Sequence, residues 1–307
     1  MNKETENKTR CGFISVVGRP NVGKSTLVNG LVGEKIAIVS SIPQTTRNRI
    51  RGVYTDERGQ IIFIDTPGLV RGKDHMDQCM KQVSFSTVEE VDCVIHLVDA
   101  NKTFGEEEQM ILERLSEIKC PLILGLNKID LKGKCAHEYI NAYQEKLGEK
   151  FNNDKRFVIL PLSGETENNL DKLIDLVFER LPEGELLYPA DTVCDVPQKM
   201  AVSDIIREKL LSIVRDEIPY SLAVEVEEMA RRRNKLTYIS ARILVESESQ
   251  KEIVIGKKGK NLKDVGTLAR KELEELLERR VFVDLYVKVS KKWREKTSIL
   301  QDLGYVG

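Results

Sequence analysis

Residues 18–25 read Gly18-Arg19-Pro20-Asn21-Val22-Gly23-Lys24-Ser25, which matches the G-x-x-x-x-G-K-[ST] pattern of a phosphate-binding loop. The apolar run 13–17 before it indicates a buried strand, and residues 24–31 after it indicate a helix. Glycines let successive backbone N–H groups turn toward phosphate oxygens, and the helix start adds partial positive charge. We therefore expect a nucleotide phosphate site, with Lys24 on the β- and γ-phosphates and the Ser25 hydroxyl on Mg²⁺. The predicted contacts in this loop are Gly18, Asn21, Val22, Gly23, Lys24, Ser25 and Thr26.

A second motif, Asp65-Thr66-Pro67-Gly68, directly follows the apolar run 61–64. If that run is a strand beside the first one, Asp65 leaves the sheet close to the phosphate loop. Its carboxylate is then placed to hold the Mg²⁺ shell, and the N–H of Gly68 is placed to sense a γ-phosphate.

A third motif, Asn127-Lys128-Ile129-Asp130, follows another apolar run at 121–126 and indicates which base is read. The Asp130 carboxylate can accept both the N1–H and the exocyclic amine of guanine, whereas adenine has no N1–H. Leaving a buried acceptor unpaired against adenine gives a discrimination on the order of several kcal/mol. Ser163 and Gly164, after the run 157–162, are predicted to supply donors near the guanine carbonyl, although the usual second residue is Ala.

These four motifs, in this order, resemble the guanine-nucleotide-binding domains of the translation-factor and Era-like class. The resemblance implies that Thr46, immediately before Arg47 in a polar loop, coordinates Mg²⁺ and caps the γ-phosphate, with Thr45 as the alternative. It implies that Lys24, Thr46 and Gly68 serve catalysis, and that Ser25, Thr46 and Asp65 hold the metal.

Leu69 departs from the small signalling GTPases, where a Gln after the second motif orients the attacking water. A leucine cannot hydrogen-bond to water, so intrinsic hydrolysis is expected to be slow. In related GTPases an Asn at the position of Asn21 helps to bind K⁺, which could replace an arginine finger. The arginines that could act instead are Arg19, Arg47, Arg49 and Arg51.

Composition favours a cytoplasmic protein of two domains. The chain has 307 residues, 41% of them hydrophobic, and the polar N-terminus does not read as a signal sequence. No segment has the apolar length needed to cross a bilayer. The six cysteines show no C-x-x-C spacing and the three histidines are isolated, so we expect reduced thiols and no Cys or His metal site.

A change of composition predicts the domain boundary. Three prolines and a glycine fall between Leu181 and Pro197, which is typical of a linker. Residues 196–307 then carry 23 Lys and Arg against 18 Asp and Glu, although the whole chain has a net charge of −1. We predict a GTPase domain at 1–181, a linker at 182–197, a second domain at 198–290 and a basic tail at 291–307.

The basic part predicts helix, strand, strand, helix, helix, strand, the element order of a type II KH domain. Its GXXG turn is Gly256-Lys257-Lys258-Gly259, followed by Lys260. The glycines allow a nucleic-acid strand to approach, the lysines neutralise phosphates, and an apolar groove would receive single-stranded RNA bases. Trp293, among basic residues of the tail, is predicted to stack on RNA, with a capping helix as the alternative.

A P-loop GTPase domain, α/β with a mostly parallel sheet, followed by an α+β type II KH domain resembles the bacterial Era family over essentially the whole chain. That resemblance implies a GTP-controlled switch that binds the 3′ end of small-subunit ribosomal RNA during small-subunit assembly. It also implies peripheral association with the inner membrane as a possibility. Two alternatives stay open: a membrane-linked signalling GTPase, and a GTPase of an RNA-modification system, disfavoured because no Cys follows Cys194.

Overall fold

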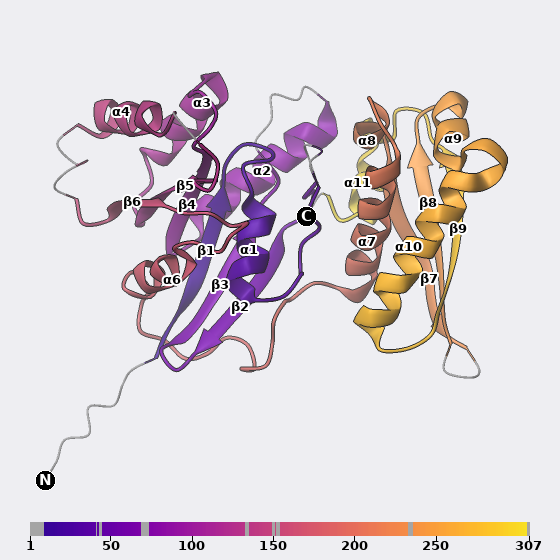
Figure 1. The fold of residues 1–307 in the computed structure, drawn as a ribbon, viewed down its shortest axis with the longest axis horizontal. Coiled ribbons are helices and arrows are strands. Elements are labelled where there is room, and N and C mark those ends of the chain that lie inside the picture. The colour runs from indigo at the N-terminus through magenta and orange to yellow at the C-terminus, as the bar shows by residue number, and fades with distance from the viewer. Residues whose placement is uncertain are drawn as a thin grey trace, which may run out of the picture. The chain divides into compact units, whose positions relative to one another are not determined.

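The computed structural model describes residues 9–40, 42, 45–68, 74–132, 135–148, 151, 154–232 and 236–305. The chain forms two compact units, each built around its own sheet (Figure 1). The first consists of Met1–Ala37, Thr46–Arg71 and Met80–Asp195, and the second of Ile38–Thr45, Gly72–Cys79 and Val196–Gly307.

The first unit holds a six-stranded sheet in the order β2-β3-β1-β4-β5-β6. Its strands are β1 (Arg10–Val17), β2 (Ile50–Asp56), β3 (Gly59–Asp65), β4 (Cys93–Asp99), β5 (Leu122–Asn127) and β6 (Phe157–Pro161). All neighbouring strands are parallel except β2 and β3. The carboxyl ends of the parallel strands meet at one edge, which is where ligands bind in such sheets.

Helices cover both faces of this sheet (Figure 1). One face packs against α1 (Lys24–Val32) and α6 (Leu170–Phe178), and the other against α3 (Glu106–Leu115), α4 (Ala136–Leu147) and the end of α2 (His75–Glu89). Every residue of β3 and β4 is buried, because both of their faces lie under helices. The predicted fold class of this domain is confirmed.

Residues 182–195, expected to be part of a linker, belong to the first unit and pack along β2 and β3. The buried Gln60 side chain accepts hydrogen bonds from the N–H groups of Leu187 and Tyr188, at 3.0 and 2.9 Å. Further along, Val53 N donates to Val193 O at 2.8 Å and Asp195 N to Arg51 O at 3.1 Å. We call residues 182–195 the strap; its backbone pairs with the edge strand β2 at Val193 and Asp195, although its composition is that of a linker.

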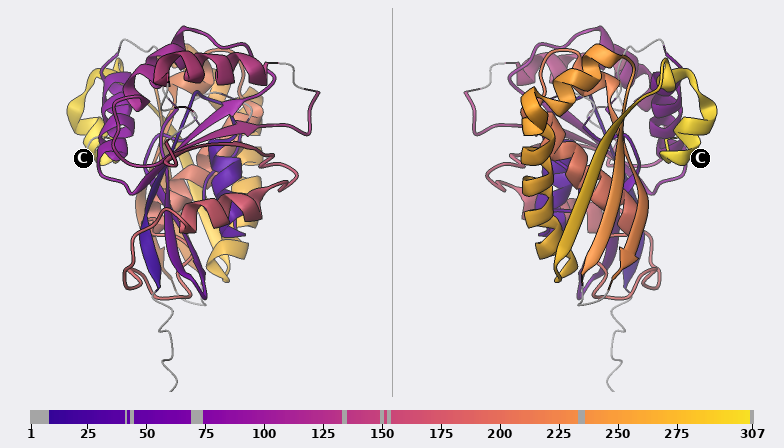
Figure 2. Two further views of the ribbon diagram at one scale, coloured as in Figure 1. Left: turned by 90° about the vertical axis from the view of Figure 1, so that its left-hand side faces the viewer. Right: turned by 90° about the vertical axis from the view of Figure 1, so that its right-hand side faces the viewer.

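The second unit has a three-stranded sheet in the order β7-β8-β9, with β7 and β8 antiparallel and β8 and β9 parallel. Its core packs α7, α9 and α10 against the sheet (Figure 2). The elements are α7 (Gln198–Ile213), α8 (Ile218–Ser221), β7 (Ala223–Arg231), β8 (Thr237–Val245), α9 (Glu248–Ile255), η2 (Lys257–Gly259), α10 (Lys260–Leu277), β9 (Val281–Val289), η3 (Trp293–Glu295) and α11 (Thr297–Asp302). The predicted order of helices and strands is confirmed.

Candidate nucleotide and RNA sites

The phosphate loop joins β1 to α1 through backbone conformations that exclude most side chains. Gly18 and Gly23 have φ of 151° and 101°, and Asn21 lies in the left-handed region at 61°. A Cβ on Gly18 would lie 2.2 Å from the carbonyl oxygen of Leu97, and one on Gly23 would lie 2.4 Å from Asn127 Nδ2. Glycine is therefore required at both positions, for close packing as well as for conformation.

Lys24 is buried at the start of α1, inside the curve of the loop. Its Nζ donates to the carbonyl oxygens of Gly18 and Arg19, at 3.1 and 2.9 Å. Burial lowers the pKa of this amine to about 8, and the negative charges of Asp65 and Glu108 oppose the shift. A phosphate placed here would meet an ammonium group that is already desolvated. Thr26, in the same first turn, follows Ser25.

Three predicted metal ligands lie together at the ends of β1 and β3. Ser25 Oγ and Thr46 Oγ1 donate to Asp65 Oδ2, at 2.7 and 3.1 Å, and the two hydroxyls are 2.8 Å apart. Asp65 is fully buried, which raises its pKa, and its Oδ1 has no hydrogen-bond partner among the described residues. An unpaired buried carboxylate oxygen beside two hydroxyls fits a hard cation such as Mg²⁺, which prefers oxygen ligands and keeps several waters.

Gly68 packs against the phosphate loop. A Cβ on this residue would lie 2.9 Å from the backbone nitrogen of Pro20, so a side chain would displace one of the two segments. Ser84 Oγ donates to the carbonyl oxygen of Pro67 at 2.9 Å and ties the end of this motif to α2. Leu69 lies outside the described residues.

The predicted base-reading residues meet at the ends of β5 and β6. Asn127 Nδ2 donates to Val22 O at 2.7 Å, and its Oδ1 accepts from Gly164 N at 3.0 Å. Asp130 is exposed, and its Oδ1 accepts from Ser163 Oγ at 2.5 Å. The carboxylate is thus held in place with its other oxygen available to a base.

Gly164 packs closely against α1. A Cβ there would lie 3.3 Å from the backbone N and Cα of Leu27, closer than ordinary van der Waals contact. A side chain at this position would therefore need the loop or the helix to shift by a few tenths of an ångström.

Asp99 was not singled out from the sequence, yet it links two of the motifs. Its Oδ2 accepts from Lys128 Nζ at 2.8 Å, and the same ammonium donates to the Asn21 carbonyl at 2.8 Å. Burial raises the pKa of Asp99, but the hydrogen bonds from Lys128 and Asn101 outweigh it and lower the pKa below its usual value. The available signal was its place directly after the apolar run of β4, at the same sheet edge as Asp65 and Asn127.

The GXXG turn of the second unit lies between α9 and α10. Gly256, Lys258 and Gly259 have positive φ, of 72°, 53° and 75°. The side chains of Lys257, Lys258 and Lys260 are exposed, and so are the apolar side chains Ile253 and Leu268 on the two flanking helices. Exposed cations beside exposed apolar groups could bind the backbone and the bases of a single strand.

Trp293 does not join this surface, which corrects the prediction that it stacks on RNA. Its side chain is 0% exposed, and its Nε1 donates to the carbonyl oxygen of Ser221 at 2.8 Å. The tail of 291–305 forms η3 and α11, so the structural alternative is the correct one for this residue.

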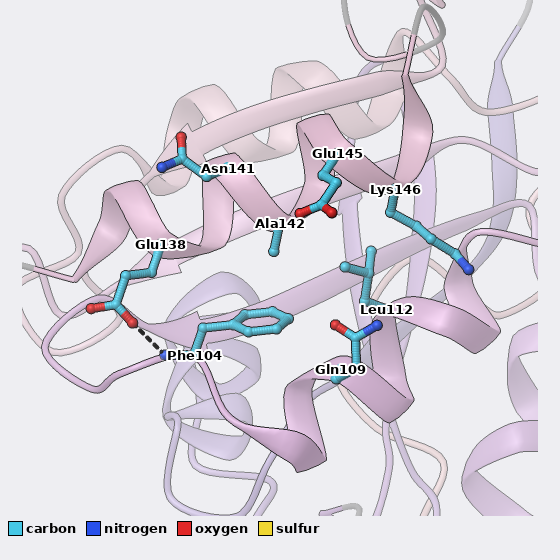
Figure 3. A pocket seen from close by; sticks show the side chains of 8 residues that line it. All are labelled: Phe104, Gln109, Leu112, Glu138, Asn141, Ala142, Glu145 and Lys146. Atoms are coloured by element: carbon cyan, nitrogen blue, oxygen red, sulfur yellow. Dashed lines mark hydrogen bonds between the residues drawn. The ribbon is translucent and has the colours of Figure 1, made fainter.

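A further cavity, of about 600 Å³, lies between α3 and α4 (Figure 3). Phe104, Leu112 and Ala142 form its apolar part, and Glu138 accepts a hydrogen bond from Phe104 N at 2.9 Å. It includes none of the predicted nucleotide residues. The nucleotide site is therefore defined by the motifs at the sheet edge and not by this cavity.

Comparison with known proteins identifies the family of each domain. Residues 13–128 match the family "50S ribosome-binding GTPase", and residues 217–294 match the family "KH domain". GTPase Era of Halothermothrix orenii is 42% identical to this chain, and the match covers 97% of this chain and 99% of that protein. GTPase Era of Geobacter metallireducens is 45% identical, and the match covers 98% of this chain and 99% of that protein.

Solved structures extend the similarity to the whole fold. Era in complex with MgGDPNP and nucleotides 1506–1542 of 16S ribosomal RNA has a TM-score of 0.90 at 35% identity, covering 97% of this chain and 100% of that chain. An Era variant from Aquifex aeolicus bound to GDP.AlF4⁻ has a TM-score of 0.88 at 35% identity, and the match covers 97% of this chain and 100% of that chain. The chain belongs to the Era family of GTPases.

Proposed function

We propose that this GTPase binds single-stranded RNA at the 3′ end of small-subunit ribosomal RNA through its GXXG turn, and that it acts in assembly of the small ribosomal subunit. The observation that carries the proposal is the similarity, along nearly the whole chain, to Era bound to nucleotides 1506–1542 of 16S ribosomal RNA. The exposed Lys257, Lys258 and Lys260 support it, because phosphate neutralisation supplies much of the affinity for RNA.

The test is RNA affinity measured by fluorescence anisotropy with a labelled oligonucleotide matching that 3′ end. Lys257→Glu with Lys258→Glu should weaken binding strongly and lower the dependence of affinity on salt, by about 0.7 in log–log slope for each phosphate that is no longer neutralised. The matched control, Arg270→Glu with Lys271→Glu, makes the same charge change at exposed positions of α10, about 15 Å along the helix from Lys260. Equal effects of both double variants would refute a site at the GXXG turn.

In the nucleotide site, we propose that Ser25, Thr46 and Asp65 hold Mg²⁺ and that Lys24, Thr46 and Gly68 act on the γ-phosphate. The orphaned Asp65 Oδ1 and the two adjacent hydroxyls support this assignment. Mg²⁺, when bound, neutralises charge on the phosphate oxygens. Gly18, Asn21, Val22, Gly23 and Thr26 would contact phosphates, and Asn127, Lys128, Asp130, Ser163 and Gly164 the base.

K⁺ is proposed as an additional cofactor near Asn21. Replacing K⁺ by Na⁺ should lower kcat in the parent protein and matter less in Asn21→Ala. Asn21 has a φ of 61°, a left-handed conformation that alanine adopts only at a cost in stability. Asn21→Gly should therefore be measured as well, because glycine removes the side chain without that cost. Equal rates in both salts would refute the cation role and leave GTP binding intact.

The proposed location is the cytoplasm, with peripheral membrane association as the alternative. Across the described ranges, no helix combines the length and apolarity that crossing a membrane demands. Flotation with liposomes, compared with co-sedimentation with small ribosomal subunits, separates the two. Association with liposomes alone would favour the membrane alternative.

A further inference from the structure

A buried polar cluster lies behind the phosphate loop. His96 of β4 and Glu108 of α3 are 0% and 1% exposed, and His96 Nε2 is 3.2 Å from Glu108 Oε2. On its other side, His96 Nδ1 is 2.6 Å from the Tyr143 hydroxyl. Burying a carboxylate costs several kcal/mol unless charged or hydrogen-bonding partners compensate. The burial of Glu108 therefore needs partners beyond one imidazole.

The second partner of Glu108 belongs to the phosphate loop. Arg19 Nη1 lies 3.8 Å from Glu108 Oε1, and Arg19 Nε donates to Glu107 Oε2 at 2.7 Å. The carbonyl oxygen of the same residue accepts a hydrogen bond from Lys24 Nζ at 2.9 Å. Arg19 thus connects the carboxylates of Glu107 and Glu108 on α3 to Lys24 in the phosphate loop.

We propose that Glu108, supported by His96, is a positioning residue for the phosphate site. It acts through Arg19, whose guanidinium is held against α3 so that the turn from Gly18 to Lys24 keeps its shape before nucleotide arrives. A loop that needs no rearrangement binds phosphate with a smaller entropic cost. The inference rests on the nucleotide function of the loop.

The experiment is a double-mutant cycle on the full chain, using Glu108→Gln and Arg19→Ala. Each single variant should raise the Kd for a fluorescent GDP about tenfold, and the double variant should be no weaker than either single one. In GTP turnover, KM should rise in proportion while kcat changes little, because the interaction that each variant removes is already made in the ground state. Tyr139→Phe is the matched control: it lies buried in the same region and should leave the Kd unchanged.

Additive effects in the cycle would overturn the proposal, as would a Glu108→Gln variant that melts earlier but binds GDP normally once folded. If Glu108→Gln does not fold, the proposal is tested with variants of Arg19 alone. Arg19→Lys, which keeps the charge facing α3, should recover most of the affinity that Arg19→Ala removes, and equal affinities of the two would overturn the proposal. Failure of the parent protein to bind GDP would instead contradict the nucleotide function itself.

Discussion

Lys24 shows how a single buried amine prepares a site for phosphate. Its pKa is lowered to about 8 because burial disfavours the charged form. Bound phosphate favours that charged form and raises the pKa. At pH 8, GDP binding should therefore take up about half a proton, and at pH 7 only about a tenth, since the amine is then already protonated. Titration calorimetry in two buffers of different ionisation enthalpy measures this proton uptake. If GDP binding took up no protons at pH 8, protonation of Lys24 on phosphate binding would be contradicted.

Asp130 allows a prediction about base selection. Asp130→Asn replaces an acceptor by an amide that can donate to the second carbonyl of xanthine. The variant should lose GTP affinity by at least about a hundredfold relative to XTP, because guanine then leaves polar groups unpaired. Competition of GTP and XTP against a fluorescent nucleotide measures the change. Ser163→Ala, which removes the bond that orients Asp130 together with the acceptor of Thr166 N, should weaken GTP binding without favouring XTP.

At the scale of one turn, the two glycines of the GXXG motif should differ in their tolerance of a side chain. Gly259 has a φ of 75° with nothing within 4 Å of an added Cβ, so Gly259→Ala should cost only the left-handed strain, about 1 kcal/mol of unfolding free energy. At Gly256 the Cβ would lie 2.5 Å from the Asn261 side chain, so Gly256→Ala should cost more. Urea unfolding of both variants measures the order, and the reverse order would contradict this account.

Local patterns were sufficient to predict the elements that carry their own signal. The strands of the first sheet are continuous apolar runs because helices cover both faces, and the motifs follow these runs directly. The strap was predicted as a linker because its prolines are visible in the sequence, whereas its pairing with Gln60 and β2 joins residues more than a hundred positions apart.

The prediction that Trp293 stacks on RNA was wrong because its structural contact also joins residues far apart in the sequence. Its basic neighbours are visible in the sequence, but its hydrogen bond to the Ser221 carbonyl joins residues 72 positions apart. The role of Asp99 depends on Lys128 reaching it from the next strand, which follows from strand order and not from spacing.

For the whole molecule, the central prediction is a reciprocal coupling of the nucleotide and RNA sites. Within the second unit, the Arg207 guanidinium of α7 donates to the carbonyl of Thr45, and the proposed metal ligand Thr46 is the next residue in the chain. GTP should therefore change RNA affinity, and RNA must change GTP affinity by the same factor.

Titrating the 3′-end RNA into protein loaded with GDP or with GDPNP measures this factor. Arg207→Lys should reduce it while leaving RNA binding to the GDP form unchanged. Identical RNA affinities in the two nucleotide states would contradict the coupling, although both binding sites could still exist.

The strap has a consequence for how the nucleotide-binding part can be produced alone. Without residues 182–195, the edge strand β2 would lose its pairing at Arg51 and Val53, and the freed C=O and N–H groups would offer a template for another copy. A fragment ending at Leu181 should self-associate as its concentration rises, whereas one ending at Asp195 should elute as a monomer in size-exclusion chromatography. A fragment that carries the nucleotide site should therefore keep the strap, because this Pro-rich segment covers part of the exposed edge of β2 and so limits aggregation.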